Sequence, residues 1–409
     1  MTGRPEEFLV LGGGIGGLVA ALALARQGRR VRVLERAPEF TEVGAGLQVG
    51  PNASRVLDRL GVLDAVTRTA FFPRRLILRD AVTGEPITAL DTGKSFVDRF
   101  GHRYFVAHRA DLHQAILAAC KESGRVELSP SKEVIGIEPR PGGALVRCAD
   151  GSRYDTGVLI GADGLHSLTR KTVVGDGPPV DSGYVAYRGT VPMEQVRACG
   201  GLGEPDGMVI WVGPSLHLVQ YPVRRGELCN QVATFDTRRY GSRHDDLSRQ
   251  LDHAFTGMCP AVVRGVSLID RSRRWPMLDR PPVRGWSAER LTLVGDAAHP
   301  MLQYLAQGAC QAIEDSVVLA DCVAARPGDT AAALKEYEAL RGPRTARVQT
   351  TARQWGDVLH IDGVGAAMRG QLLSQRDQDD FGIVEWLYGY DPNEAVAQRE
   401  LAEKTAASA

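Results

Sequence analysis

Three glycines near the N-terminus have the spacing of a phosphate-binding turn. Gly12, Gly14 and Gly17 fit the pattern G-x-G-x-x-G. In this pattern the first glycine allows a tight turn, the second lets the backbone approach a pyrophosphate, and the third lets helix and strand pack closely. Glu35 lies 18 residues after Gly17, where an acidic side chain would accept hydrogen bonds from ribose hydroxyls. These residues predict a dinucleotide site, and the motif by itself allows either NAD or FAD.

Two further glycine turns follow short apolar segments later in the chain. Asp163 comes after the segment 157–160, and Asp296 comes after the segment 291–294. Neither turn repeats the G-x-G-x-x-G motif. A flavin enzyme whose nicotinamide has no domain of its own accounts for this arrangement better than a simple dehydrogenase does.

The segment 216–222 could carry acid–base chemistry. Side chains alternate across a strand, so His217, Val219 and Tyr221 would share one face. A histidine and a tyrosine on one face suit a pocket for a phenol. His217 could accept the phenol proton, because its unperturbed pKa is near ~6.5. The alternative is a core histidine whose hydrogen bonds are satisfied within the sheet.

The glycine turns need strands and helices to position them. Residues 8–11 form a short apolar segment, residues 18–27 are rich in alanine and leucine, and residues 31–35 alternate and end in an acid. This order predicts a strand, a glycine turn, a helix and a second strand. The apolar segments before Asp163 and Asp296 are typical of further buried parallel strands.

The pattern changes between about residues 183 and 276, where strand-like segments recur at 184–191, 208–212, 216–223 and 228–235. Their alternation predicts an antiparallel sheet with one polar face. From 331 to 348 the pattern is helical and charged. A nucleotide-binding domain is therefore expected to be interrupted by a β-rich domain.

Composition excludes several classes of protein. The chain has 409 residues, enough for two or three structural units, and 49 basic residues balance 49 acidic ones. This balance argues against a dedicated nucleic-acid binder and against a polybasic membrane-surface protein. The first apolar segment, residues 8–11, is too short for a signal peptide, and no stretch approaches about 18 apolar residues, so neither a signal peptide nor a transmembrane segment is expected.

The cysteines indicate the cellular compartment, and the histidines bear on whether a metal site is expected. The seven cysteines are scattered and form no C-x-x-C pair, which indicates buried thiols in a reducing compartment. His102, His108 and His113 lie close in sequence, but no carboxylate or cysteine set completes a metal site. We expect a cytoplasmic protein without a metal.

The chain resembles the group A flavoprotein aromatic hydroxylases, the single-component FAD monooxygenases of the 4-hydroxybenzoate hydroxylase fold. The resemblance covers nearly the whole chain and rests on three motifs in the family's order: Gly12-x-Gly14-x-x-Gly17 with Glu35, Asp163-Gly164-x-x-Ser167-x-x-Arg170, and Gly295-Asp296-Ala297-Ala298-His299-Pro300. It implies non-covalent FAD, a visiting nicotinamide (NADH or NADPH) as co-substrate, and molecular oxygen.

Together with the residue patterns, the resemblance predicts an α/β + β fold: a Rossmann-like FAD-binding domain interrupted by an antiparallel-sheet substrate domain, with C-terminal helices. We expect the discontinuous FAD-binding domain at 1–75, 100–180 and 277–355. The β-rich substrate domain is expected at 76–99 and 181–276, and a C-terminal helical segment at 356–409.

The resemblance also implies roles for individual residues. The cofactor-binding residues would be Gly12, Gly14, Gly17, Glu35, Arg36, Gln48, Arg109, Asp163, Asp296 and Gly308. The substrate-binding residues would be Tyr104, His217, Tyr221 and Gln303. Of these, His217, Gln303 and Tyr221 would be catalytic, with His217 accepting a proton and Gln303 orienting the substrate hydroxyl.

Within the family, segments 42–51, 182–189 and 299–306 resemble the 3-hydroxybenzoate 6-hydroxylases. Many members have proline where Gln303 stands, and many have asparagine where Cys310 stands. The resemblance implies hydroxylation of a phenolic aromatic acid through a flavin hydroperoxide, with 3-hydroxybenzoate giving 2,5-dihydroxybenzoate (gentisate), by a homodimer. Salicylate and 6-hydroxynicotinate are alternative substrates. An FAD oxidase or dehydrogenase, and a redox-sensing FAD protein, are alternatives from other classes.

Overall fold

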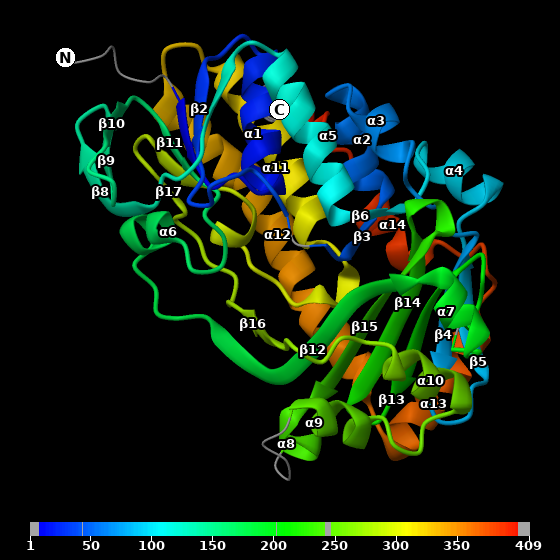
Figure 1. The fold of residues 1–409 in the computed structure, drawn as a ribbon. Coiled ribbons are helices and arrows are strands. Elements are labelled where there is room, and N and C mark those ends of the chain that lie inside the picture. The colour runs from blue at the N-terminus through cyan, green and yellow to red at the C-terminus, as the bar shows by residue number, and fades with distance from the viewer. Residues whose placement is uncertain (1–7, 43, 202, 242–246, 400–409) are drawn as a thin grey trace.

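The N-terminal glycine turn lies at the centre of a parallel sheet. The computed structural model describes residues 8–42, 44–201, 203–241 and 247–399. Six of its strands lie side by side in the order β17 (Ser287–Ala288), β18 (Leu291–Leu293), β11 (Leu159–Gly161), β1 (Phe8–Leu11), β2 (Val31–Leu34) and β7 (Val126–Ser129). Neighbours pair in parallel except β17 with β18. The predicted strand–turn–helix–strand unit is therefore present (Figure 1).

Both faces of this sheet are covered. One face packs against α1 (Ile15–Arg26), α5 (Arg109–Glu122) and α11 (Gly308–Ala325), and the layer continues into α2 (Pro51–Arg59) and α3 (Leu63–Thr67). The other face packs against a three-stranded antiparallel sheet of β8 (Val134–Arg140), β9 (Gly143–Cys148) and β10 (Arg153–Thr156). Burial on both faces explains why these strands are continuous apolar segments in the sequence. The short helix α6 (Leu168–Val173) follows β11.

A second, seven-stranded sheet contains the β-rich part of the chain. Its order is β16 (Trp275–Asp279), β12 (Val180–Pro192), β15 (Leu228–Asp236), β14 (Leu216–Val223), β13 (Met208–Gly213), β4 (Arg75–Asp80) and β5 (Pro86–Asp91). All neighbours are antiparallel except β13 and β4. The four strand-like segments predicted between residues 184 and 235 lie within β12 to β15.

The predicted polar face of this sheet lines a cavity, and the opposite face belongs to a buried apolar core. Tyr187, Trp211 and Phe235 point to a face that is buried by α9 (Leu247–Ala254) and α10 (Pro260–Ser267). The short helices α7 (Met193–Ala198) and α8 (Thr237–Tyr240) lie beside β12 and β15. Alternation in the sequence arose because the opposite face lines a cavity, so polar residues there do not face bulk solvent.

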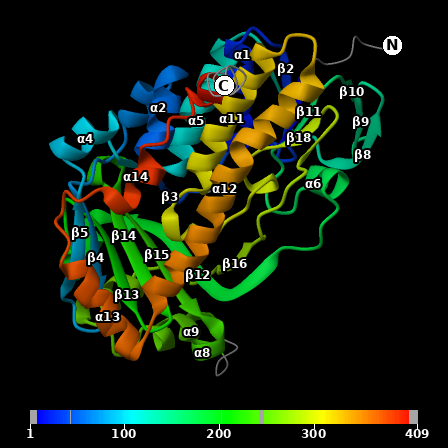
Figure 2. The ribbon, with the colours of Figure 1, turned by 180° about the vertical axis from the view of Figure 1, so that it is seen from behind.

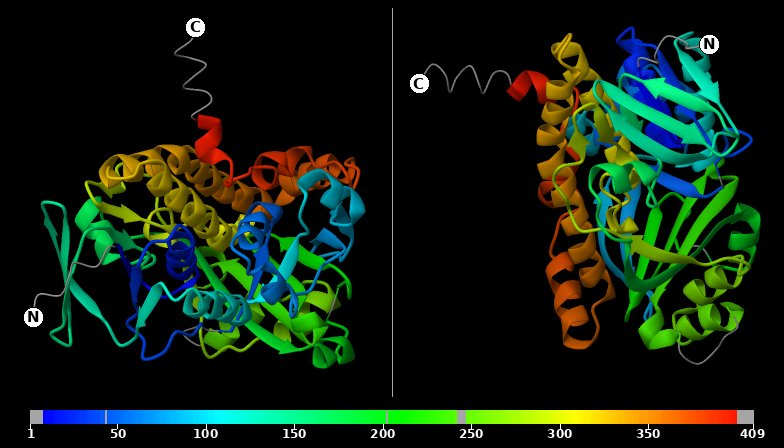
Figure 3. Two further views of the ribbon diagram at one scale, coloured as in Figure 1. Left: turned by 90° about the horizontal axis from the view of Figure 1, so that it is seen from above. Right: turned by 90° about the vertical axis from the view of Figure 1, so that its left-hand side faces the viewer.

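A long helix connects the two sheets. The helix α12 (Thr330–His360) packs against α11 and β17 along its first part and against β13 and β14 near its end (Figure 2). The helices α13 (Gly363–Ser374) and α14 (Gly382–Tyr388) follow, beside β5 and α2 respectively. Figure 3 shows these C-terminal helices along one side of the molecule. The predicted helical segment 331–348 lies within α12.

Shorter elements fill the space between the sheets. The strands β3 (Gly46–Val49) and β6 (Phe105–His108) form an antiparallel pair, and α4 (Lys94–Phe100) precedes β6. Single 3-10 turns are η1 (Arg224–Gly226), η2 (Gly295–Ala297) and η3 (Gln303–Leu305). Within the described residues, no helix is both long enough and apolar enough to span a membrane.

Candidate functional site

A cavity of about 720 Å³ extends from the N-terminal glycine turn to the seven-stranded sheet. Gly14 and Asp296 line it on the side of the parallel sheet, and His217 and Tyr221 line it on the side of β14. Nine of the sequence-predicted site residues line the cavity: Gly14, Gln48, Tyr104, Arg109, His217, Tyr221, Asp296, Gln303 and Gly308. Five predicted residues lie outside the lining: Gly12, Gly17, Glu35, Arg36 and Asp163.

The glycine turn has no room for side chains at two of its three positions. Gly12 has a φ of +107°, and a Cβ on it would lie 2.3 Å from the carbonyl oxygen of Ala162. A Cβ on Gly17 would lie 2.0 Å from the carbonyl oxygen of Gly12. Gly14 instead borders open space and caps α1 without a side-chain hydrogen bond. Gly12 and Gly17 therefore shape the turn, and Gly14 leaves the N-terminus of α1 open to the cavity.

The acidic residue after β2 is tied to the glycine turn. One carboxylate oxygen of Glu35 accepts a hydrogen bond from the backbone N–H of Gly13 at 2.7 Å, and the other accepts one from Ala37 at 2.8 Å. Arg36, which follows, is exposed. The structure therefore fixes the orientation of Glu35, whereas it leaves Arg36 on the surface.

The carboxylate of Asp163 acts within its own turn. It accepts hydrogen bonds from Ser167 Oγ at 2.5 Å, from Thr169 N at 3.0 Å and from Thr169 Oγ1 at 3.1 Å. Buried Arg170 donates to the carbonyl oxygens of Ala297 and Ala298 at 3.0 and 2.5 Å. This second motif therefore connects the turn at Asp163 to the turn at Asp296.

The cavity face of the seven-stranded sheet carries the histidine and the tyrosine predicted from alternation. His217, Val219 and Tyr221 line the cavity, whereas Leu216 and Leu218 belong to the core on the other face. Gln303, from the turn η3 opposite, donates a hydrogen bond to Thr234 Oγ1 on β15 at 3.1 Å. His217 and Thr234 are paired neighbours on β14 and β15, so Gln303 comes close to His217.

Tyrosines and an amide form the other polar part of the lining. Tyr104 donates a hydrogen bond to Gln48 Oε1 at 2.5 Å. Burial raises the pKa of Tyr104 well above its ordinary value, and burial also raises the pKa of Tyr221. Both phenols are therefore neutral at physiological pH and can serve as hydrogen-bond donors.

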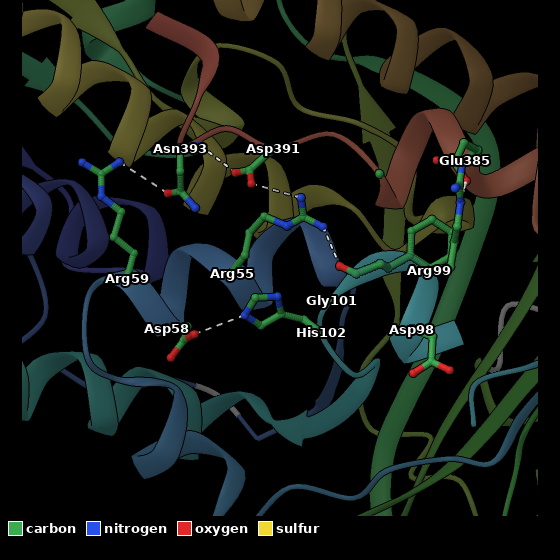
Figure 4. A pocket seen from close by; sticks show the side chains of 12 residues that line it. Arg55, Asp58, Arg59, Asp98, Arg99, Gly101, His102, Glu385, Asp391 and Asn393 are labelled. Carbon is green, nitrogen blue, oxygen red and sulfur yellow. Dashed lines mark hydrogen bonds and ion pairs between the residues drawn. The ribbon is translucent and has the colours of Figure 1, made fainter. Parts of the chain in front are cut away.

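A second cavity, also of about 720 Å³, opens at the surface beside α2, α4 and the C-terminal segment (Figure 4). Its charged side chains are paired, either with one another or with the adjacent residues Lys94 and Asp321. Arg55 lies 3.4 Å from Asp391, and His102 lies 3.2 Å from Asp58. Because these pairs hold the C-terminal segment against α2, we place the functional site in the cavity that His217 lines.

Comparison with known proteins identifies the family. The chain matches the FAD binding domain family over residues 6–352. It is 39% identical to the 3-hydroxybenzoate 6-hydroxylase of Polaromonas naphthalenivorans, over 97% of this chain and 100% of that protein. It is 33% identical to the 6-hydroxynicotinate 3-monooxygenase of Pseudomonas fluorescens, over 85% of this chain and 90% of that protein. The chain belongs to this FAD-binding family.

Solved structures agree with the assignment. The crystal structure of Klebsiella pneumoniae HpxO with FAD and uric acid is 29% identical, with a TM-score of 0.79 over 95% of this chain and 97% of that one. A salicylate hydroxylase substrate complex is 25% identical, with a TM-score of 0.78 over 96% of this chain and 97% of that one. The family and the fold class predicted from the three motifs are confirmed, and this FAD-binding protein is an enzyme of the aromatic hydroxylase group.

The residues on the parallel-sheet side fit FAD. Gly14, Ile15 and Gly16 line the cavity at the N-terminus of α1, where backbone N–H groups favour a pyrophosphate. Asp296 is exposed into the same cavity. Two backbone N–H groups hold the carboxylate of Glu35 beside this turn.

A buried network of charges supports the turn at Asp296, and the sequence pattern did not predict this network. Asp315 accepts hydrogen bonds from Gly295 N at 3.0 Å, from His299 Nε2 at 2.6 Å and from Arg341 Nε at 2.7 Å. Burial by itself would raise the pKa of Asp315, but His299 and Arg341 lower it to about 2. Arg341 also donates to Glu314 at 2.6 Å. Gly295 and His299 belong to the third motif, but no short motif contains Glu314, Asp315 and Arg341, since these come from α11 and α12.

Arg188 is a further cavity residue for which no role was predicted from the sequence. Three arginines line the cavity, and Arg109 and Arg376 are paired with Glu42 and Asp380 respectively. Half-buried Arg188 forms no ion pair with the part of the chain that the structure describes, and its guanidinium lies 4.7 Å from the ring of Trp275. Burial lowers the pKa of Arg188. An uncompensated cation in a cavity is suited to an anionic ligand group.

Among the described residues, no group of three or more His, Cys, Asp or Glu side chains is placed to hold a metal ion.

Proposed function

We propose that this enzyme uses FAD, NAD(P)H and O2 to hydroxylate a phenolic aromatic acid. Its substrate is 3-hydroxybenzoate and its product is 2,5-dihydroxybenzoate, with one oxygen atom entering the ring and the other leaving as water. The observation that carries the proposal is one cavity with a dinucleotide turn on one side and a histidine, a tyrosine and a glutamine on the other. Relatives named as 3-hydroxybenzoate 6-hydroxylases support this choice of substrate.

The cofactor would supply the redox chemistry, and the protein would bind the cofactor and exclude water. When bound, FAD supplies electron transfer from the nicotinamide to oxygen and the electrophilic oxygen that enters the ring. The chain holds FAD through the N-terminus of α1, Glu35 and Asp296. Tyr104 and Gln48 extend the polar lining, and the apolar side chains of the cavity exclude water.

His217 is the proton acceptor in this proposal. A phenolate attacks an electrophile far more readily than a phenol does, so the enzyme needs a base at the substrate hydroxyl. Burial lowers the pKa of His217 well below its ordinary value, with a further contribution from His360, so the imidazole is neutral and can accept a proton. Gln303 orients the hydroxyl without accepting its proton, and Tyr221 donates a hydrogen bond.

Arg188 holds the substrate carboxylate. It is the cavity-lining arginine without an ion pair in the described residues, so a benzoate would supply its missing anion. Along β12 it lies two residues from Ala186, which pairs with Thr234, the partner of Gln303. This separation supports a substrate that carries its carboxylate and its hydroxyl at different positions of one aromatic ring.

Domain division, assembly and location belong to the same proposal. The pairing of β4 and β5 within the seven-stranded sheet supports assigning residues 76–99 to the substrate domain. The homodimer rests on the family resemblance, and light scattering of the holoenzyme would test it. All seven cysteines are free, which supports a reducing cytoplasm.

Product analysis tests the substrate. The purified protein with FAD is incubated with NADH or NADPH and, in turn, with 3-hydroxybenzoate, salicylate, 6-hydroxynicotinate and unsubstituted benzoate. We expect 2,5-dihydroxybenzoate from 3-hydroxybenzoate and little turnover of benzoate, which lacks the hydroxyl. Product from salicylate or 6-hydroxynicotinate alone would replace the proposed substrate. Nicotinamide oxidation without any hydroxylated product would indicate an oxidase.

A further inference from the structure

The proposed base is hydrogen-bonded to a second histidine. His217 Nδ1 lies 2.7 Å from His360 Nε2, and the two rings stack with centroids 5.0 Å apart. The residues are 143 positions apart in sequence, on β14 and at the C-terminus of α12. Both side chains are buried, with exposed fractions of 2% and 6%.

The surroundings hold His360 in one place. Its backbone carbonyl accepts a hydrogen bond from Ser215 N at 3.0 Å, so both its backbone and its side chain are bound to the start of β14. Its ring stacks on Tyr184 at 4.6 Å, and Tyr304 packs edge-on at 5.2 Å. Such a fixed ring can determine how its partner is oriented and protonated.

A hydrogen bond between two neutral imidazoles uses one N–H and one lone pair. If His360 Nε2 is the acceptor, His217 carries its proton on Nδ1. The remaining nitrogen of His217, Nε2, then has a free lone pair, and His217 lines the cavity. The reverse arrangement would place the proton on Nε2 and leave His217 unable to accept one.

We propose that His360 is a positioning residue that accepts the Nδ1–H of His217 and so keeps the Nε2 lone pair available to the substrate hydroxyl. The inference rests on the proposed function. When the phenol proton moves to Nε2, His217 becomes an imidazolium, and its bond to His360 becomes charge-assisted and stronger. His360 thus favours both the correct tautomer before proton transfer and the charged state after it.

Charged and titratable groups on neighbouring elements act on this pair. Burial lowers the pKa of His360 to about 4, although the carboxylate of Asp236 on β15 raises it and Arg369 on α13 lowers it further. Tyr184 on β12 and Tyr304 on η3 face the ring as neutral phenols, because burial raises the pKa of each. His360 therefore remains neutral at physiological pH and keeps a lone pair for the Nδ1–H of His217.

The test compares three substitutions in the holoenzyme: His360→Gln, which keeps an acceptor at this position, His360→Leu, which removes it, and His360→Asn, which is too short to reach. His102→Gln is the matched control, because it changes a surface histidine paired with Asp58. FAD content and thermal unfolding establish that each variant is folded. The measurements are dihydroxybenzoate formed per NADH consumed, hydrogen peroxide released, and the apparent pKa of bound 3-hydroxybenzoate from its phenolate absorption.

We expect His360→Leu and His360→Asn to lose coupling by about tenfold or more, since losing a general base typically costs ~100-fold or more in the step it serves. The bound phenol should show a raised apparent pKa in both. His360→Gln should stay within about twofold of the parent, because an amide oxygen also accepts from N–H. His102→Gln should match the parent.

Two results would overturn the inference. One is a folded His360→Leu and His360→Asn pair that couples as the parent does. The other is a His360→Gln variant as uncoupled as His360→Leu, which would show that a titrating imidazole is needed and not an acceptor. If the parent itself forms no dihydroxybenzoate, the proposed function fails instead. Even then, the bound-phenol titration reports separately on His217 and His360.

Discussion

At the scale of single residues, the polar side chains in this cavity differ in whether another side chain of the protein already forms an ion pair or hydrogen bond with them. Arg109 and Arg376 have carboxylate partners, whereas Arg188 has none in the described part of the chain. Tyr104 is hydrogen-bonded to Gln48, and His217 to His360. A substrate with one anionic group and one hydroxyl could therefore bind the guanidinium of Arg188 and the remaining ring nitrogen of His217.

Replacing Arg188 tests the carboxylate role. Arg188→Met should raise the KM for 3-hydroxybenzoate by ~10–100-fold, because hydrogen bonds to charged groups contribute about 1.5–3 kcal/mol. The KM for the uncharged analogue 3-hydroxybenzyl alcohol should change little. Steady-state kinetics with both compounds make the comparison. Arg376→Met is the control, since that arginine lines the same cavity but is paired with Asp380. An equal loss for both compounds would contradict the assignment.

At the scale of elements, the strand–turn–helix unit and the α11–α12 pair carry the cofactor side of the site. The turn places the N-terminus of α1 at the cavity, and two helices place buried charges beneath the turn at Asp296. These elements therefore fix the positions of the α1 N-terminus and of the turn at Asp296.

Alanine substitutions at two glycines of the turn should have different effects on stability and on FAD binding. A Cβ on Gly17 would collide with the carbonyl oxygen of Gly12, so Gly17→Ala should lower the unfolding free energy of the apo-protein by about 1–3 kcal/mol. A Cβ on Gly14 meets only ordinary contacts, so Gly14→Ala should leave apo-stability within ~0.5 kcal/mol. It should nevertheless weaken FAD binding, because the methyl group enters the cavity. Urea unfolding and FAD titration separate the two effects; similar behaviour of both variants would count against these roles.

Arg341 tests the buried network. It has no exposed surface and is paired with Glu314 and Asp315. Arg341→Met should reduce the unfolding free energy by about 3–5 kcal/mol, because it removes the cation that two buried carboxylates share and leaves their negative charge under-compensated. Arg239→Met, which breaks a surface pair with Asp362, should cost at most ~1 kcal/mol. Denaturant unfolding of both variants decides; equal losses would show that the network is not what holds α11 and α12 together.

At the scale of the whole molecule, the cavity lies between two sheets that are joined by α12 and by the β3–β6 pair. His217 and His360 sit where the end of α12 reaches the seven-stranded sheet, so their protonation is coupled to the packing of the two layers. Folding stability should therefore respond to pH through these histidines.

The direction of this response follows from the pKa of His360, which burial lowers to about 4. In the unfolded chain its pKa is about 6.5, so between pH 6.5 and 4 the unfolded state binds a proton that the folded state does not. The unfolding free energy should fall as the pH falls through this range, by up to about 3 kcal/mol from His360. Urea unfolding at several pH values should show a shallower decline in His360→Gln, and an unchanged decline would contradict the assignment.

Much of the fold could be predicted because its signals are local. The glycine spacing, the apolar strand before it and the acidic residue after β2 lie within about thirty residues, and backbone geometry requires them there. The alternation of 216–222 placed His217 and Tyr221 on one face for the same reason, since successive side chains on a strand point to opposite sides. Alternation also placed Leu216 and Leu218 on the other face, but it does not reveal that α9 and α10 cover that face.

The sequence by itself therefore determined the dinucleotide turn and the position along the chain of the β-rich part between the parallel strands. It also determined which face of β14 could contact a ligand. Only the tertiary structure decided which of these groups remain free for a ligand. Asp163 is hydrogen-bonded within its own turn, Arg188 has no ion pair within the described residues, and His360 is hydrogen-bonded to His217 although 143 positions separate them. The physical reason is that hydrogen bonds and ion pairs are short-range, so whether a polar side chain is satisfied depends on neighbours that folding brings from distant parts of the chain.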